Sequence, residues 1–350
     1  MDISLLRLSG IAIGMLLLVI LALKLRKQTA SNLLILLLAF SSISIFIAAS
    51  YPNLIGYISS VFLPNLPGMR LIALIGTATI VVFALLFYIF SIIEEHRKQL
   101  DGICKYLALE KITKKYKLGK AGIKPIVVIV PVFNEDKNIS QVLDVMPKEI
   151  NTHKVVVLLI DDGSTDQTEQ IALKYETIFL KHPVNRGGGA AIRTGFEAAK
   201  KFDPAAVVTM DGDGQHDPRE IKVLIDPVIN GCADCVIGSR VLAKQVASSR
   251  LRGAGIVFFS FLISMITKQK ITDCSSGFRV FSTRAIDRVN LRQDQYHTAE
   301  MIIELSKYKF NTIELPVRMK NRTSGQSKKG PDVLYGVYFL IAIISSWLRA

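Results

Sequence analysis

The stretch Ala205-Ala206-Val207-Val208-Thr209-Met210-Asp211-Gly212-Asp213-Gly214-Gln215 decides the fold of this chain, because an apolar run ends directly in two spaced carboxylates. Glycines separate and follow the carboxylates, so the backbone there can turn tightly and approach a ligand. Hard oxygen ligands at the carboxyl end of a buried strand suit Mg²⁺ or Mn²⁺. A second acidic strand end precedes this one, at Leu159-Ile160-Asp161-Asp162-Gly163-Ser164, and two such ends together indicate a binding site.

Short apolar runs and amphipathic stretches alternate around these motifs, between residues 125 and 240. We expect strands at Ile126–Pro131, Val155–Ile160, Thr177–Leu180, Ala205–Met210 and Cys235–Ile237. We expect helices at Lys137–Met146, Asp166–Tyr175, Gly189–Lys200 and Pro218–Ile229. This alternation predicts an α/β domain with a mostly parallel, Rossmann-like sheet that helices cover on both faces. Polar residues follow three of the strands, so they are expected to meet at one edge of the sheet.

Apolar residues concentrate in the first hundred positions of the 350-residue chain. Three runs, Leu5–Leu23, Asn32–Ala49 and Leu71–Ile93, each approach the ~20 residues that cross a bilayer core. We therefore expect transmembrane α-helices at about 5–23, 32–49 and 71–93, within a membrane module at 1–100. Three buried core helices of a soluble protein are the alternative. The first run lacks a basic start and a small-residue cleavage site, so we do not expect a cleaved signal peptide.

Lysines and arginines crowd the loop after the first apolar run and the segment after the third, whereas residues 51–69 contain none. The positive-inside rule then predicts an integral protein of the cell membrane or an ER-like membrane, with its N-terminus outside and its catalytic domain in the cytoplasm. A basic juxtamembrane linker is expected at 101–123, a globular domain at 124–330 and an apolar interfacial or membrane helix at 331–350. The apolar stretch Arg250–Lys268 has basic ends, which fits an interfacial helix or an amphipathic core helix equally well.

The net charge of +14 raises the question of nucleic acid, but no aromatic–basic platform or helix-turn-helix pattern supports such a partner. Attraction of the basic linker to anionic lipid headgroups is the simpler interpretation, and membrane lipid is the expected partner. Four cysteines are scattered along the chain, and Cys232-Ala233-Asp234-Cys235 has no second Cys/His pair to complete a zinc site.

Six motifs occur in order along the globular domain. They are Pro131-Val132-Phe133-Asn134-Glu135, Asp161-Asp162-Gly163-Ser164-Thr165-Asp166, Asn185-Arg186-Gly187-Gly188-Gly189-Ala190, Met210–Pro218, Ser275-Ser276-Gly277-Phe278-Arg279, and Arg322-Thr323-Ser324-Gly325-Gln326-Ser327-Lys328. Over residues 124–330 this order resembles the family 2 glycosyltransferases with the GT-A fold, of the dolichyl- or polyprenyl-phosphate sugar synthase type (dolichol-phosphate mannosyltransferase-like). The first hundred residues resemble small three-span membrane modules that can precede such enzymes.

The resemblance implies a set of nucleotide-sugar-binding positions. These are Pro131, Phe133, Glu135, Asp161, Asp162, Gly188, Asp211, Arg322, Ser327 and Lys328, the last three on a loop that closes over the donor diphosphate. Asp211, Asp213 and Gln215 are the expected ligands of Mn²⁺ or Mg²⁺. Asp166 and Asp217 are better explained as helix caps, and His216 as a structural residue.

The acceptor side of the site is expected to be cationic, because the reaction brings two anions together. By resemblance, Arg240 and Arg252 hold the acceptor phosphate, and the spacing adds Arg279 as a third cation. Asp273 is expected to orient or activate the acceptor, and Glu300 to touch sugar hydroxyls. For each arginine, an ordinary surface ion pair is the alternative.

The reaction implied is metal-dependent, inverting transfer of a sugar from a nucleoside-diphosphate sugar to dolichyl or undecaprenyl phosphate, for glycan assembly or protein glycosylation. The Asp-Gly-Asp-Gly-Gln-His form favours UDP-glucose or UDP-N-acetylglucosamine over GDP-mannose. A processive polysaccharide synthase would need a Gln-x-x-Arg-Trp motif, and the one tryptophan, Trp347, follows Ser345-Ser346 instead. A non-catalytic scaffold or lipid-translocation partner is the other alternative, and self-association stays open.

Overall fold

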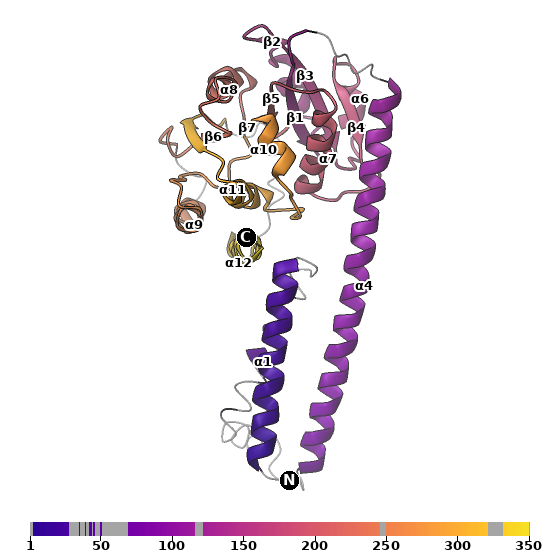
Figure 1. Ribbon diagram of the computed structural model, residues 1–350. Helices are drawn as coiled ribbons and strands as arrows, with labels where there is room; N and C mark the ends of the chain where they lie inside the picture. The colour runs from indigo at the N-terminus through magenta and orange to yellow at the C-terminus, as the bar shows by residue number, and fades with distance from the viewer. Residues whose placement is uncertain are drawn as a thin grey trace. The chain divides into compact units, whose positions relative to one another are not determined.

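The computed structural model describes residues 3–27, 69–115, 122–245, 250–320 and 332–349, together with the single residues 35, 39, 42, 43, 45 and 50 (Figure 1). The chain forms two compact units, one of residues up to Gln99 and one beginning at Leu100. The candidate site lies in the second unit. Three of the residues expected on the donor loop, Arg322, Ser327 and Lys328, lie outside the described residues.

The first unit contains α1 (Ile3–Lys27) and the first part of α4 (Met69–Lys115). The hydroxyl of Ser42 donates a hydrogen bond to the carbonyl of Gly14 at 3.0 Å. Among the residues that the structure describes, no helix is both long and apolar enough to cross a bilayer, so the three expected spans are not confirmed. Most of the second apolar run, Asn32–Ala49, lies outside the described residues.

The second unit is built on an eight-stranded sheet in which seven strands follow the order β2-β3-β1-β5-β7-β6-β8 and the eighth, β4, also pairs with β3. The strands are β1 (Ile126–Val132), β2 (Glu149–Ile150), β3 (His153–Asp161), β4 (Ile178–Lys181), β5 (Ala206–Thr209), β6 (Cys235–Ser239), β7 (Arg279–Phe281) and β8 (Thr312–Pro316). Five of the eight coincide with the strands expected from the sequence. The parallel pairs β1–β3, β1–β5, β3–β4 and β6–β8 confirm the mostly parallel sheet.

Strand β7 is the main departure from the expected sheet, because it runs antiparallel between β5 and β6. Its three residues are too few to show a strand period in the sequence. Its insertion has a consequence for the site, since it places the loop before Arg279 beside the carboxyl end of β5. Thr209 Oγ1 donates to the carbonyl of Gly277 at 2.9 Å across this join.

Both faces of the sheet are buried, and alternate residues of β1 serve the two cores. Val127 and Ile129 belong to one apolar cluster, whereas Val128 and Val130 belong to the other. The first core includes residues of α7 (Gly188–Lys200), α9 (Arg250–Thr267), α11 (His297–Lys307) and α12 (Asp332–Leu348). The second includes residues of α5 (Ile139–Asp144) and α8 (Ile221–Ile229). A strand buried on both faces has no polar alternation, which explains the continuous apolar runs in the sequence.

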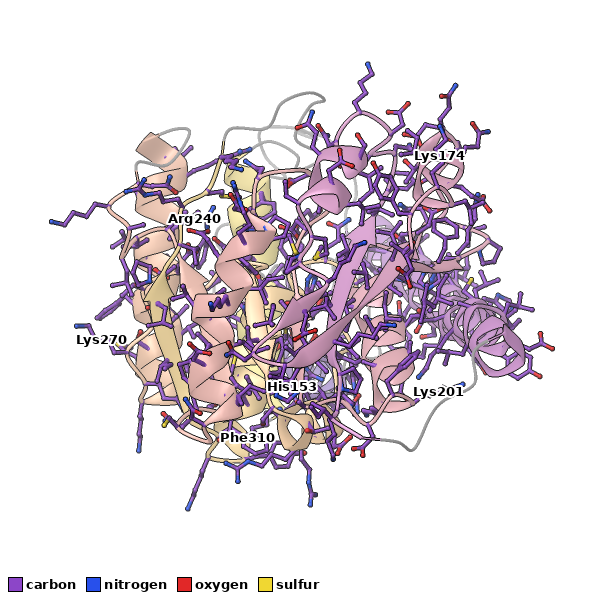
Figure 2. The ribbon with its side chains drawn as sticks, turned by 90° about the horizontal axis from the view of Figure 1, so that it is seen from above. His153, Lys174, Lys201, Arg240, Lys270 and Phe310 are labelled. Atoms are coloured by element: carbon purple, nitrogen blue, oxygen red, sulfur yellow. The ribbon has the colours of Figure 1, made fainter. Side chains whose placement is uncertain are left out.

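Residues 101–115, expected as a linker, continue α4 without a break. Cys104 and Ala108 are buried, and Ala108 is part of the first apolar cluster. The remaining helices of the unit are α6 (Thr168–Ala172), the 3-10 turn η1 (Pro218–Glu220) and α10 (Thr283–Arg288). Figure 2 shows Arg240, which follows β6, toward one end of the sheet, and His153 and Phe310, which lie at the starts of β3 and β8, toward the other.

Candidate active site

The ends of β1, β3 and β5 lie side by side, because the three strands are parallel neighbours in the sheet. Val132 pairs with Asp161, and Ile129 pairs with Thr209, so the residues after each strand reach the same edge. A Cβ on Gly212 would lie 2.5 Å from Val132 Cγ1, which explains why a glycine separates the two aspartates of the β5 end. The acidic strand ends predicted from the sequence therefore do meet.

Asp161 is fully buried and holds its own turn together. Its Oδ1 accepts a hydrogen bond from the Ser164 amide at 2.8 Å. Its Oδ2 has no hydrogen-bond partner among the described residues, and Lys181 Nζ lies 3.7 Å away. Burial raises the pKa of this carboxyl above its ordinary value, despite its hydrogen bonds with Ser164. Gly163 has a positive φ of 80°, and a side chain there would meet the backbone of Asn185.

Asp162 is engaged by protein groups on both oxygens. It accepts hydrogen bonds from the amides of Arg186 at 3.0 and 3.1 Å and of Gly187 at 2.6 Å. His182 Nδ1 donates to the same carboxylate at 2.8 Å, and His182 Nε2 lies 2.9 Å from the hydroxyl of Thr194. Asp162 therefore anchors the glycine-rich loop at the start of α7, next to Gly188, rather than presenting free oxygens at the edge.

The loop after β1 is joined to the loop after β3. Asn134, which has a positive φ of 53°, accepts the Thr165 amide on its Oδ1 at 2.9 Å. The Glu135 amide donates to the Thr168 hydroxyl at 2.9 Å, and its carboxylate accepts from Asn138 Nδ2 at 2.7 Å. Pro131 and Phe133 are half-buried at this edge. Both side chains are therefore partly accessible at this edge.

Asp217 is a helix cap as expected, whereas Asp166 has a capping contact but is not itself the N-cap, which is Gln167. Asp166 accepts the Thr168 amide at 3.0 Å, one residue before the N-cap of α6. Asp217 is the N-cap of η1 and accepts the Arg219 amide, with Pro218 in the first turn. Hydrogen bonds from Arg219 hold the pKa of the Asp217 carboxyl well below its usual range. Neither carboxylate belongs to the ligand-binding edge.

Asp211 differs from the other strand-end carboxylates, because its side chain is 47% exposed. Within the described part of the chain no hydrogen bond reaches its carboxylate oxygens, and the nearest basic nitrogen is His216 Nδ1 at 4.0 Å. His216 is buried against Phe278 and accepts the Asp211 amide at 3.3 Å, which agrees with a structural role. Asp213 is buried, and its Oδ1 accepts the Gln215 amide at 3.1 Å.

Asp211, Asp213 and Gln215 fit a divalent cation that shares its coordination with a ligand. Among the described residues no cluster of three His, Cys, Asp or Glu side chains forms a complete metal cage. Mg²⁺ in particular is held by one or two carboxylates together with substrate phosphates and water, rather than by an all-protein cage. An exposed carboxylate without hydrogen bonds, two residues from a second carboxylate, is such a donor set.

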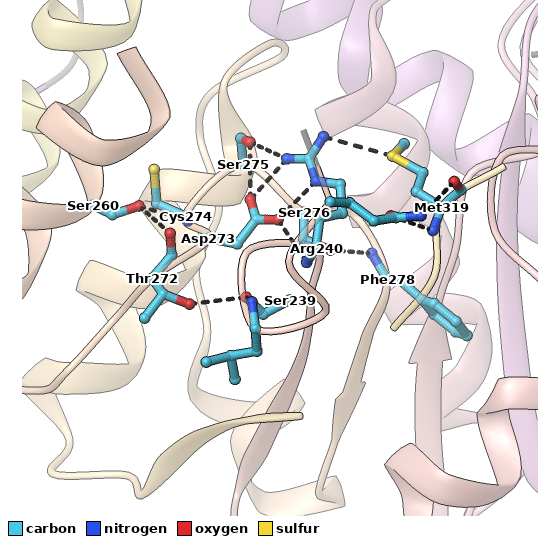
Figure 3. A network of polar contacts seen from close by, with 12 residues as sticks. Ser239, Arg240, Ser260, Thr272, Asp273, Cys274, Ser275, Ser276, Phe278 and Met319 are labelled. Carbon is cyan, nitrogen blue, oxygen red and sulfur yellow. Dashed lines mark hydrogen bonds and ion pairs between the residues drawn. The ribbon is translucent and has the colours of Figure 1, made fainter. Parts of the chain in front are cut away.

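Arg240 lies on the other side of this edge and is held by a rigid set of acceptors (Figure 3). Its Nε and one terminal nitrogen each donate to Asp273 at 2.7 Å, and that terminal nitrogen also contacts Ser275 Oγ at 2.6 Å. Burial alone would lower the pKa of Arg240, but the hydrogen bonds and charge of Asp273 outweigh it and raise the pKa. Its side chain stays 22% exposed, so the guanidinium can still meet a ligand.

Asp273 is completely buried, and its backbone is fixed by Glu314 through the amide of Asp273 at 2.9 Å. Burial would raise the pKa of this carboxyl, but the hydrogen bonds and charge of Arg240 hold it below its ordinary value. A buried, ionised and fully paired carboxylate orients Arg240 rather than touching a substrate. Of the two roles expected for Asp273, the structure favours orientation, through Arg240, over activation.

The expectation that Arg279 is an acceptor-binding cation is wrong. Its side chain is fully buried, and the guanidinium donates to the carbonyls of Ser276, Cys274 and Thr298 at 2.7 to 3.0 Å. Burial lowers its pKa. Glu300 is likewise fully buried and accepts the amides of Arg292 and Gln293, so it cannot touch sugar hydroxyls. Both residues stabilise loops instead.

The segment before the expected donor loop is placed beside the acidic edge. The Lys320 amide donates to the Gln215 carbonyl at 2.7 Å, and Lys320 Nζ lies 3.0 Å from Asp217. Met319 exchanges two hydrogen bonds with the side chain of Gln245. The chain thus enters the segment that contains Arg322, Ser327 and Lys328 directly next to Asp213–Gln215, and those three residues lie outside the described part.

Sequence reasoning missed three residues that shape the site: His182, Ser275 and Glu314. Ser275 is part of the motif Ser275–Arg279, so the sequence did indicate that it could belong to the site. His182 and Glu314 had none, because His182 contacts Asp162, 20 residues away along the chain, and Glu314 contacts Asp273, 41 residues away. Arg252 lies in the first turn of α9 with a half-buried side chain. Burial raises the pKa of the nearby Tyr335 phenol, despite the opposing charges of Arg252 and Arg240.

Comparisons with known proteins agree with this geometry. Residues 127–289 match the family model described as glycosyl transferase family 2. The chain is 34% identical over 227 residues to an uncharacterized protein of Methanocaldococcus jannaschii. The aligned region covers 63% of this chain and 90% of that protein. It is 30% identical over 238 residues to the UDP-N-acetylglucosamine–dolichyl-phosphate N-acetylglucosaminyltransferase of Methanococcus voltae, with coverage of 61% and 92%.

Among solved structures, the chain resembles glucosyl-3-phosphoglycerate synthase from Mycobacterium tuberculosis, in complex with Mn²⁺, UDP and glucosyl-3-phosphoglycerate. The TM-score is 0.50 at 19% identity, over 68% of this chain and 82% of that one. The likeness supports the Rossmann-like GT-A sheet. With an acidic edge, a family model and relatives of this coverage in agreement, the chain belongs to glycosyl transferase family 2 and is a glycosyltransferase.

Proposed function

We propose that this glycosyltransferase moves one sugar from a nucleoside-diphosphate sugar to a dolichyl or other polyprenyl phosphate, with a divalent cation and with inversion. The observation that carries the proposal is the short connection between Asp211 and Arg240. Loop 273–277 holds Arg240 through Asp273 and Ser275, and a Cβ on Gly277 would lie 2.8 Å from Asp211 Oδ1. A metal-binding carboxylate and an anion-binding cation therefore face one small region.

The donor half of the site lies on the β1 and β5 side. Pro131 and Phe133 are available to the nucleoside, and Asp161 and Asp162 support the loops around it. Asp211, Asp213 and Gln215 would hold Mn²⁺ or Mg²⁺, which neutralises charge on the leaving diphosphate when it is bound. Arg322, Ser327 and Lys328 would close over the same diphosphate, because their segment begins beside Gln215.

The acceptor half is made by arginines. A phosphate monoester has a second pKa of about 6, so at neutral pH the acceptor is already an anionic nucleophile and needs no strong catalytic base. The protein's task is to overcome repulsion between two anions, which Arg240 and Arg252 would do by binding the acceptor phosphate. An acceptor oxygen attacks the anomeric carbon as the bond to the diphosphate breaks, so an α-linked donor yields a β-linked product.

A lipid acceptor is supported by the apolar surface of α9 beside Arg252. Val257, Phe258 and Phe261 are each more than half exposed. Helix α9 packs on α12 through Phe259 and Phe339, whose ring centroids are 4.9 Å apart. An apolar helix face next to basic residues is typical of helices that lie in a membrane interface. We accordingly propose that the enzyme acts at the cytoplasmic face of a membrane, to which the apolar N-terminal segments attach it.

The relative from Methanococcus voltae is named for UDP-N-acetylglucosamine and dolichyl phosphate. Its coverage of the catalytic unit supports the same acceptor class here and favours a UDP-sugar over GDP-mannose.

The test uses the full chain in detergent with polyprenyl phosphate, Mn²⁺ and, in turn, labelled UDP-N-acetylglucosamine, UDP-glucose and GDP-mannose. We expect a chloroform-soluble product that contains one sugar, formed from one donor and abolished by EDTA. A long water-soluble polymer would favour a processive synthase instead. No lipid-linked product with any of the donors would contradict the proposed acceptor.

A further inference from the structure

The glycine-rich loop at the start of α7 is fixed between two parts of the catalytic unit. On one side, Asp162 accepts the amides of Arg186 and Gly187. On the other side, the Gly189 amide donates to the Asp294 carbonyl at 2.6 Å, and a Cβ on Gly189 would lie 2.0 Å from the Gln293 carbonyl. Only a glycine permits this approach, so the position of the loop depends on the segment that contains Gln293 and Asp294.

An arginine on α7 fastens that segment to the loop. Arg193 donates to Asp294 Oδ1 at 2.5 Å and to the Gln293 carbonyl at 3.2 Å, and its side chain is only 17% exposed. Burial would lower the pKa of Arg193, but the charges of Asp294 and Asp101 outweigh it and raise the pKa. The cation is thus kept in place by carboxylates from two separate elements.

The second of those carboxylates, Asp101, comes from α4. Its Oδ1 accepts from Arg193 at 3.1 Å and lies 3.8 Å from Nε of Arg186, within the glycine-rich loop itself. One turn further along α4, Cys104 is buried, and Ala108 after it joins the core of the sheet. Asp101 therefore lies between two arginines, one in the glycine-rich loop and one in α7. Buried residues later in α4 hold Asp101 in this position.

We propose that Asp101 is a positioning residue for the donor: it sets the glycine-rich loop through Arg186 and Arg193 without touching substrate. The residue lies before Val127, where the match to the family model begins. The inference rests on the proposed function, because it assigns the loop to the nucleoside-diphosphate sugar.

The test compares Asp101→Asn with the parent chain, as the full chain in detergent, by calorimetric titration with UDP and Mn²⁺ and by steady-state kinetics. We expect UDP affinity to fall and the KM for the donor to rise by about tenfold, because a loop displaced by a fraction of an ångström loses its aligned contacts. The KM for polyprenyl phosphate should not change. Asp203→Asn is the matched control, since Asp203 pairs with Lys124 at an exposed site.

Asp101→Glu separates charge from packing, because it keeps a carboxylate that can reach both arginines. We expect it to restore most of the UDP affinity. If Asn and Glu weaken UDP binding equally, or if Asp101→Asn lowers only the unfolding temperature and leaves the donor KM unchanged, the positioning role is overturned. A parent chain that binds no nucleoside diphosphate would overturn the proposed function and this inference together, whereas a parent that binds UDP normally confines any failure to Asp101.

Discussion

The acidic ends of β3 and β5 look alike in the sequence but do different work. Both carboxylate oxygens of Asp162 accept hydrogen bonds, from backbone amides and from His182. The side chain of Asp211 is 47% exposed, and its carboxylate accepts no hydrogen bond in the described chain. The two ends lie one strand apart, on either side of β1. A strand-end carboxylate is thus available to a ligand only where neighbouring loops leave its oxygens without hydrogen bonds.

The arginines repeat the same contrast. Arg279 is buried and satisfied by three backbone carbonyls, whereas Arg240 is oriented by Asp273 and keeps an exposed part. In both comparisons, the residue with the more complete set of protein partners supports a loop. The residue that is held but not covered, Arg240, is the one proposed to meet the substrate.

The largest effect is expected at the β5 end. Asp213→Ala should lower metal-dependent turnover by about 10²- to 10³-fold, because the charge that develops on the leaving diphosphate loses its metal clamp. Turnover is measured as chloroform-soluble product over a range of Mn²⁺ concentrations, with the unfolding temperature as the check on folding. Asp226→Ala, which removes an exposed carboxylate on α8, should leave activity unchanged. Near-normal turnover of Asp213→Ala would refute the ligand assignment.

The next effect concerns Arg252, the half-buried arginine of α9 that is proposed to bind the acceptor phosphate. Arg252→Ala should raise the KM for polyprenyl phosphate by roughly 10- to 100-fold, the loss expected for a hydrogen bond to a charged group. The donor KM should stay within a factor of two or so. Arg288→Ala, which changes an exposed arginine of α10, is the matched control. An unchanged dependence on the lipid would remove Arg252 from the acceptor site.

A smaller effect is expected at the β3 end. Asp162→Asn should reduce the free energy of unfolding by about 1–3 kcal/mol, since an amide cannot accept all the hydrogen bonds that the carboxylate receives. Denaturant unfolding of the variant and of Asp203→Asn measures the difference. If Asp162→Asn abolished Mn²⁺ binding while unfolding like the parent, the contrast between the two strand ends would collapse.

The smallest effect is a pH dependence of the ion pair between Asp273 and Arg240. The folded-state pKa of Asp273 is depressed, so its contribution to stability is present above its unfolded pKa of about 4 and is lost as the pH falls through the folded value. The stability difference between the parent and Asp273→Asn should be constant from pH 7 to pH 5. Below that it should shrink by about 1.4 kcal/mol for each unit of pKa depression. A difference that instead grew in acid would reverse the assigned sign.

Much of this arrangement was predictable from residue order. Five strands and the acidic edge could be predicted from apolar runs that end in polar residues. A strand that is buried on both faces appears in the sequence as such a continuous apolar run. Strand β7 and the burial of Arg279 were not predictable. A strand of three residues is too short to show alternation of apolar and polar residues, and the sequence does not show whether an arginine is buried. The role of Asp101 depended on contacts with residues 92 positions away, which no local pattern encodes.

Mn²⁺ binding in the presence of a nucleoside diphosphate, followed by electron paramagnetic resonance, tests the central claim most directly. The parent chain and Asp162→Asn should each bind one Mn²⁺ per chain with UDP present, the latter at reduced UDP affinity. The double variant Asp211→Asn/Asp213→Asn should bind none at the same concentrations. Mn²⁺ binding that survives in the double variant, or that is lost only in Asp162→Asn, would contradict the account.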